Sequence, residues 1–151
     1  MTHKDKTLKF IACVTELKKN NELRYYKERY MDFSDELLGL IDSHLSPDEI
    51  YIEFGKNISD IEDDYAFNNI FYREDLFEYL LEKNYDKKEA FELMECIRKG
   101  KLRHQKISGL ANKAGKDFYE WAVKVRYLPS RKHIFDCLYP LNDKFEYLCW
   151  E

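Results

Sequence analysis

The sequence predicts an all-α protein, and three observations support this fold class. Apolar residues recur at helical spacing along most of the 151 residues. Only 5 Gly and 3 Pro are present, which favours long elements joined by few tight turns. Helix start and stop signals flank several of the apolar segments. We expect about 7–9 helices in one domain over 1–151, because a chain of this length has room for one sizeable core.

The first half of the chain contains four successive helix patterns. Ser46, Pro47 and Glu49 form a start signal with a capping box, so a helix should begin at Pro47. The segment 51–54 is also β-prone, which leaves one short strand open as an alternative. Residues 55–69 lack periodicity and should form a connecting loop. The apolar sets are Phe10, Ile11, Val14 and Leu17; Leu23, Tyr26 and Tyr30; Leu37, Leu38, Ile41 and Leu45; and Ile50, Tyr51 and Phe54.

The second half carries clearer signals. Asp86 followed by Glu89 predicts a capping box, and Gly100 stands where a helix ends in a left-handed residue. Pro129 and Ser130 should stop one helix and start the next. The residues expected to face inward are Leu76, Phe77, Leu80 and Leu81; Ala90, Phe91, Met94 and Ile97; Phe118, Trp121, Ala122 and Val125; and Ile134, Phe135 and Leu138.

Composition also bears on location. No segment is apolar over a length that would cross a bilayer, and the N-terminus lacks the apolar core of a signal peptide. We therefore expect a cytoplasmic protein with no membrane partner. Its four cysteines, Cys13, Cys96, Cys137 and Cys149, form no CxxC pair and are expected to be free thiols.

Charge is distributed unevenly along the chain. Residues 1–97 hold 13 Lys and Arg against 23 Asp and Glu, whereas residues 98–151 hold 12 against 6. The net charges of the two parts are therefore −10 and +6. The cations concentrate in the segment 98–133, and a basic surface of this kind attracts phosphates through counterion release. The alternative is that the acidic part packs beside the basic part and neutralises it.

Three blocks between residues 70 and 140 carry a resemblance to a known family. They are IFYREDLFEYL at 70–80, AFELMECIRKGK at 90–101, and an aromatic-rich stretch that ends in VRYLP at 125–129 and Lys132-His133. Together they resemble the fingers region of the PolC-type bacterial DNA polymerase III α subunit. The chain would then comprise an acidic helical part at 1–69 and a fingers-like helical part at 70–151.

The resemblance implies a helical surface near template, primer and incoming nucleotide, with basic residues that face phosphates. The RKGK turn at 98–101 and the Lys132-His133 step match the family by position. The charge pattern adds further cations of the segment 98–133. The predicted nucleic-acid-binding residues are Arg98, Lys99, Lys101, Arg103, Arg126, Arg131, Lys132 and His133.

The chain differs from the family in that it lacks the residues that carry out the polymerase reaction. The palm-domain carboxylates that hold two metal ions fall outside the matching region, and no strand-borne acidic pair replaces them. We therefore expect a non-catalytic module without cofactor or metal that binds DNA, RNA or a nucleotide-bearing partner. The alternative is a protein-interaction module that binds a replication protein or a second copy of itself, because a pI of about 5.7 is unusual for a DNA-binding protein.

Overall fold

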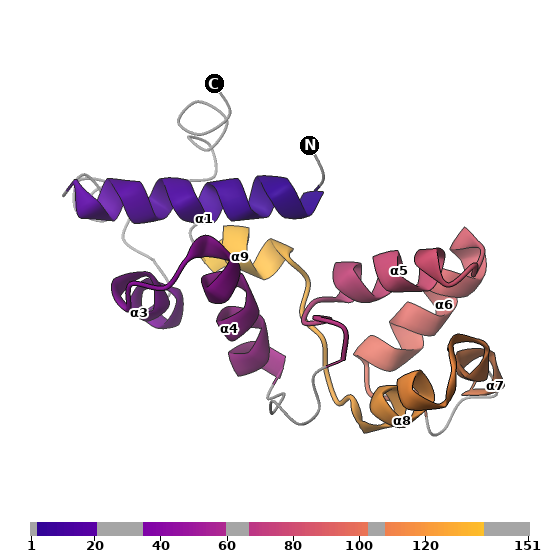
Figure 1. The fold of residues 1–151 in the computed structure, drawn as a ribbon. Coiled ribbons are helices and arrows are strands. Elements are labelled where there is room, and N and C mark those ends of the chain that lie inside the picture. Colours follow the sequence, from indigo (N-terminus) through magenta and orange to yellow (C-terminus); the bar gives the residue numbers. More distant parts are fainter. Residues whose placement is uncertain (1–2, 21–34, 60–66, 103–107, 138–151) are drawn as a thin grey trace. The chain divides into compact units, whose positions relative to one another are not determined.

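The computed structural model describes residues 3–20, 35–59, 67–102 and 108–137 of the chain (Figure 1). Every regular element in these ranges is a helix, which confirms the predicted all-α class. None of the described helices is both long and apolar enough to cross a membrane. The elements are α1 (His3–Lys19), α3 (Asp35–Asp42), α4 (Pro47–Ser59), α5 (Arg73–Glu82), α6 (Lys87–Arg98), α7 (Ser108–Ala111), the 3-10 helix η3 (Asn112–Ala114), α8 (Lys116–Lys124) and α9 (Lys132–Cys137).

The chain divides into two compact units. The first comprises Met1–Phe54 and Arg131–Glu151, and the second comprises Gly55–Ser130. The chain passes into the second unit within α4 and returns to the first just before α9. These boundaries differ from the expected division between residues 69 and 70, and a single domain over 1–151 stays a prediction.

The first unit has a core formed by the apolar faces of its helices. The predicted faces of α1, α3 and α4 are buried, except that Leu45 is half-buried beyond the end of α3. The predicted set of Leu23, Tyr26 and Tyr30 lies outside the described residues. The buried apolar residues are Phe10, Ile11, Val14, Leu17, Leu37, Leu38, Ile41, Ile50, Tyr51, Phe54 and Ile134.

Helix α4 begins at Pro47, as predicted, and its capping box is formed. The backbone N–H of Glu49 donates to Ser46 Oγ at 3.2 Å, and the N–H of Ser46 donates to Glu49 Oε1 at 3.3 Å. The alternative of a strand at 51–54 is wrong, and the expected loop does not begin at residue 55, because α4 continues to Ser59. Gly55 is buried, and a Cβ there would lie 2.9 Å from Phe71 Cβ, so close packing accommodates a poor helix former inside the helix.

The second unit is built on α5 and α6, which run side by side in Figure 1, together with α7, η3 and α8. The predicted stripe of α8 is buried, and its ring of Phe118 lies 5.5 Å from that of Tyr79 in a stacked arrangement. Phe67 stacks on Trp121 at 5.7 Å. The buried residues of this core are Ile70, Leu76, Leu80, Tyr85, Ala90, Leu93, Met94, Cys96, Ile97, Leu102, Ala111, Phe118, Trp121, Ala122, Val125 and Leu128.

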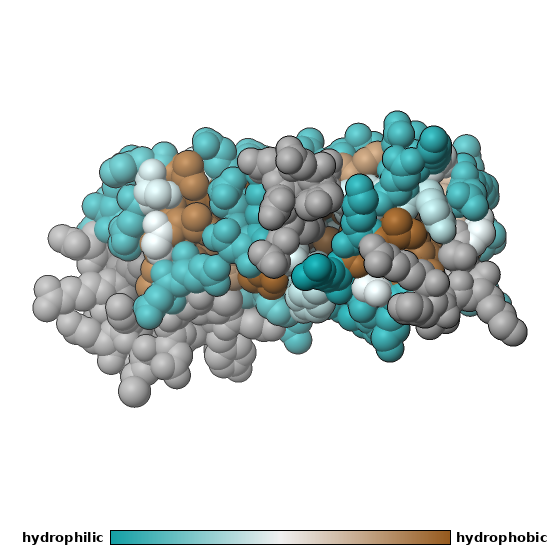
Figure 2. All heavy atoms as spheres, turned by 90° about the horizontal axis from the view of Figure 1, so that it is seen from below, coloured by the Kyte–Doolittle hydropathy of each residue, from teal (hydrophilic) through white to brown (hydrophobic). Residues whose placement is uncertain are grey.

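One predicted core residue of α6 is exposed. Ala90, Met94 and Ile97 are buried as predicted, whereas the side chain of Phe91 is 55% exposed. Phe91 follows Ala90 by one residue, which rotates it by about 100° around the helix and away from the buried stripe. On the face shown in Figure 2, hydrophilic residues cover most of the coloured surface and hydrophobic residues are visible in separate areas between them.

Among the cysteine side chains that the structure describes, Cys13 differs from the expectation of free thiols. Cys13 is disulfide-bonded, which corrects that expectation for this residue. Cys96 is free and buried in the core of the second unit, and burial raises the pKa of its thiol.

Candidate nucleic-acid interface

The predicted phosphate-binding residues fall into both units. Arg98, Lys99, Lys101 and Arg126 belong to the second unit, whereas residues 131–133 belong to the first. Arg103 lies outside the described residues. The basic segment 98–133 is therefore not a continuous part of one unit, and each group of cations has to be considered within its own unit.

The cations of the RKGK turn lie at the end of helix α6. Its start is fixed by Asp86, whose side chain accepts a hydrogen bond from the backbone N–H of Glu89 at 2.8 Å, as the sequence predicts. Its end is fixed by Gly100, which has a φ of +69°. The N–H of Gly100 donates to Ile97 O at 2.9 Å, and the N–H of Lys101 donates to Cys96 O at 3.1 Å. This pair of bonds is a Schellman motif, and it confirms the predicted helix end.

Gly100 also lets a second backbone segment approach the turn. A Cβ on Gly100 would lie 2.6 Å from the carbonyl oxygen of Arg126 and 3.1 Å from its Cα. Beside this contact, the N–H of Leu128 donates to Arg98 O at 3.1 Å. The absence of a Cβ therefore brings the backbone of Arg126, rather than a ligand, against the turn.

Because the backbone of Arg126 contacts the Gly100 turn, four of the predicted cations lie on two segments of the chain that are in contact. We call Arg98, Lys99, Lys101 and Arg126 the Gly100 turn cluster. Lys99, Lys101 and Arg126 are exposed, and Arg98 is half-buried. The positive charges of Lys101 and Lys99 also act on the buried thiol of Cys96. They lower its pKa and so oppose the increase in this pKa that burial causes.

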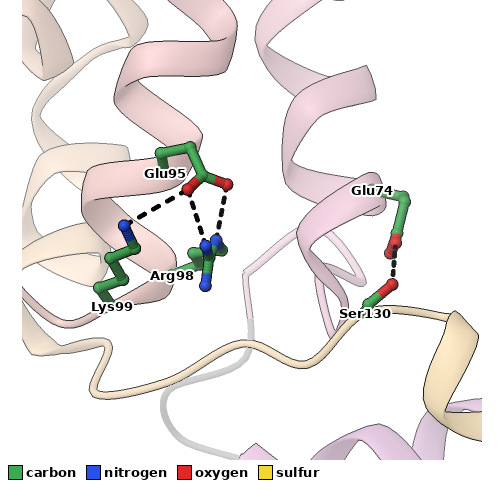
Figure 3. Close-up of polar contacts among 5 residues, drawn as sticks. All are labelled: Glu74, Glu95, Arg98, Lys99 and Ser130. Atoms are coloured by element: carbon green, nitrogen blue, oxygen red, sulfur yellow. Dashed lines mark hydrogen bonds and ion pairs between the residues drawn. The ribbon is translucent and has the colours of Figure 1, made fainter.

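Two members of the cluster bind a carboxylate of their own helix. Arg98 Nε donates to Glu95 Oε1 and Arg98 Nη2 donates to Glu95 Oε2, both at 2.7 Å (Figure 3). Lys99 Nζ lies 3.5 Å from Glu95 Oε2. The hydrogen bonds from Arg98 lower the pKa of Glu95, and those same bonds raise the pKa of Arg98. Glu95 thus neutralises part of the cluster, which holds four cations against this one carboxylate.

The cations near α9 have a different environment. Arg131 is fully buried, and its Nε donates to the hydroxyl of Tyr51 at 2.7 Å. Its guanidinium also lies over the Tyr51 ring, 6.0 Å from the centroid. A buried guanidinium is not accessible to a nucleic acid, so the prediction that Arg131 contacts phosphate is at odds with its position. Lys132 is exposed and His133 is half-buried.

Ser130, the predicted start of the last helix, lies in the second unit. Its hydroxyl donates to Glu74 Oε2 at 3.1 Å (Figure 3). The backbone N–H of Arg73 donates to Pro129 O at 2.9 Å, so the segment before α9 is fixed against the start of α5. These bonds give Ser130 a structural partner within its own unit.

Glu95 is the residue that the sequence interpretation missed. The signal was present, because a glutamate three and four residues before two cations on a helix is a favourable ion-pair spacing.

Comparison with family models, curated proteins and solved structures finds no match to this chain. The arrangement around Gly100 therefore has to be interpreted from its own geometry.

Proposed function

We propose that this chain is a non-catalytic helical module that binds DNA, RNA or a nucleotide-bearing partner through the Gly100 turn cluster. The observation that carries the proposal is the contact between the Gly100 turn and the backbone of Arg126, which places exposed cations of two segments next to each other. This site is narrower than the basic segment 98–133, because the cations that follow Ser130 belong to the other unit.

The local geometry suits a phosphate in two ways. Arginine presents a planar fork of donors that matches two phosphate oxygens, and lysine adds a mobile positive charge. The carbonyl groups at the end of a helix would normally repel an anion. Here the carbonyls of Cys96, Ile97 and Arg98 accept backbone hydrogen bonds from residues that follow the helix, which reduces this repulsion.

The resemblance to the PolC-type fingers region supports the same proposal at the RKGK turn. The proposed role is limited to binding, because the family's metal-holding carboxylates lie outside the matching region. A replication-related role follows from the resemblance and is part of the proposal, together with the cytoplasmic location expected from the sequence.

A titration with single-stranded DNA and with primer–template DNA at low salt tests this function. The variant Lys99→Glu/Lys101→Glu should bind weakly, and its plot of log affinity against log salt concentration should be shallower by about 2. The matched control Lys87→Glu/Lys88→Glu makes the same change in charge at the other end of α6. No binding at low salt, or an equal loss in the control, would overturn the proposal.

A second candidate function is protein interaction, and Phe91 favours it. Among the residues that the structure describes, Phe91 is the one large hydrophobic side chain classed as exposed. It lies on α6, and the exposed residues of this helix include a cation, Lys88, and a carboxylate, Glu92. A second copy of the chain carries the same cation and the same carboxylate on its own α6, so opposite charges of the two copies can face each other across such a surface.

Light scattering tests this second candidate. If Phe91 mediates self-association, the wild-type mass should rise with concentration and Phe91→Ser should remain a monomer. The control Lys88→Ser changes a neighbouring exposed residue without removing the aromatic ring. Equal masses for the wild type and Phe91→Ser at all concentrations would exclude this role.

A further inference from the structure

The contact of Glu95 with Arg98 and Lys99 has the geometry of anion recognition. Both carboxylate oxygens accept hydrogen bonds from the two donors of the Arg98 fork, and Lys99 lies beside one of these oxygens. Arginine recognises carboxylates and phosphates through the same bidentate arrangement. The side chains involved are 18% exposed for Arg98 and 25% for Glu95, so the contact is partly shielded from water.

The structure assigns to Arg98 and Lys99 a phosphate-binding position that the chain's own Glu95 carboxylate occupies in the absence of ligand. We call it the Glu95 position. This inference rests on the proposed function, and it adds a mechanism by which the chain limits its own affinity. A phosphate of a nucleic acid has to displace Glu95, while Lys101 and Arg126 offer exposed charges that need no such displacement.

The arrangement does more than neutralise charge. The two hydrogen bonds from Arg98 engage both donors of its guanidinium fork at the end of α6, so a phosphate can use this fork only after the carboxylate has left it. Because Glu95 makes the hydrogen bonds, it is the main competitor.

Removal of the Glu95 charge should therefore increase affinity. An ion pair of this kind on a helix surface is worth a factor of about two to five in an equilibrium constant. We expect Glu95→Gln to bind single-stranded oligothymidylate more tightly than the wild type by about this factor. Its salt dependence should also be steeper, because Arg98 and Lys99 would then release mobile counterions on binding in place of the fixed carboxylate.

Glu92→Gln is the matched control. Glu92 lies on the same helix and is exposed, and the carboxylate bonded to Arg98 is that of Glu95, so substitution of Glu92 makes the same change in net charge without freeing Arg98. The double variant Glu95→Gln/Arg98→Gln tests whether the gain in affinity passes through Arg98. Far-UV circular dichroism of each variant establishes that the helices remain folded.

The outcomes separate this inference from the proposed function. Tighter binding and a steeper salt dependence in Glu95→Gln than in Glu92→Gln, both lost in the double variant, would support the Glu95 position. If the wild type binds and the two single variants behave alike, the Glu95 position is overturned and the proposed function stands. If no variant binds at low salt, both are overturned. If Glu95→Gln binds and the wild type does not, Glu95 closes the position completely, and the proposed function is overturned for the wild-type chain.

Discussion

Replacement of Gly100 by alanine tests the geometry on which the Gly100 turn cluster depends. Gly100 has a φ of +69°, which costs a residue with a side chain about 1–2 kcal/mol. The new Cβ would also lie 2.6 Å from the carbonyl oxygen of Arg126, a contact that requires one backbone segment to move. Such a movement weakens the hydrogen bond from Leu128 N to Arg98 O, which is worth about 0.5–1.5 kcal/mol.

The expected destabilisation of the second unit by Gly100→Ala is therefore about 1.5–3.5 kcal/mol. Urea unfolding followed by tryptophan fluorescence measures it. Trp121 is buried in the core of this unit, and a Trp150→Phe background leaves it as the single tryptophan, since the chain holds two. With a slope near 2 kcal/mol per M, the midpoint should fall by about 1 M.

Two further substitutions distinguish the causes. A Cβ added at Gly109 would have no neighbour within 4 Å, and Gly109 has no positive φ, so Gly109→Ala should not lower the midpoint. Gly100→Asn relieves the backbone strain, because Asn tolerates the left-handed region, but its Cβ meets the same carbonyl. We expect its midpoint to lie between those of the two alanine variants. Equal midpoints for Gly100→Ala and Gly109→Ala would refute the close approach of Arg126.

Three other substitutions test individual contacts. Tyr51→Phe removes the acceptor of the buried Arg131 Nε and should cost about 1–3 kcal/mol in thermal unfolding; an unchanged transition would contradict the hydrogen bond. Asp86→Ala removes the cap of α6 and should cost about 1 kcal/mol, most of which Asp86→Ser should restore. The pKa of Glu95 is lowered from its ordinary value of 4.5, so Glu95 stabilises the fold above that pH and this contribution is lost as the pH falls below it. The urea midpoint of Glu95→Gln should therefore fall less on acidification than that of the wild type, and parallel curves would argue against the ion pair.

Local signals in the sequence predicted the helices and several of their ends. The capping boxes at Ser46 and Asp86 and the glycine end at Gly100 all formed as predicted. They were predictable because a cap depends on residues within one turn of each other, whose contacts the chain imposes directly. The loop was expected to begin at residue 55 because residues 55–69 lack helical periodicity, whereas α4 continues to Ser59 and Gly55 packs closely against Phe71, which is distant in sequence.

The candidate site was predictable only in part. The sequence indicated which cations are concentrated in the chain, but their accessibility depends on packing. Arg131 has the same charge as Arg126, yet one is buried against Tyr51 and the other is exposed. The partner of Arg131 is 80 residues away, and no local pattern reveals such a pairing.

The sequence by itself determined the all-α class, the core faces of α1 and α8, the start of α6 after Asp86 and its end at Gly100. These properties follow from periodicity and from interactions between near neighbours in the chain. Only the tertiary structure decided that the basic segment is divided between two units, that Phe91 is exposed, and that Gly100 makes room for Arg126. The physical reason is that burial and close contact are set by residues far apart in sequence, which meet only when the helices pack.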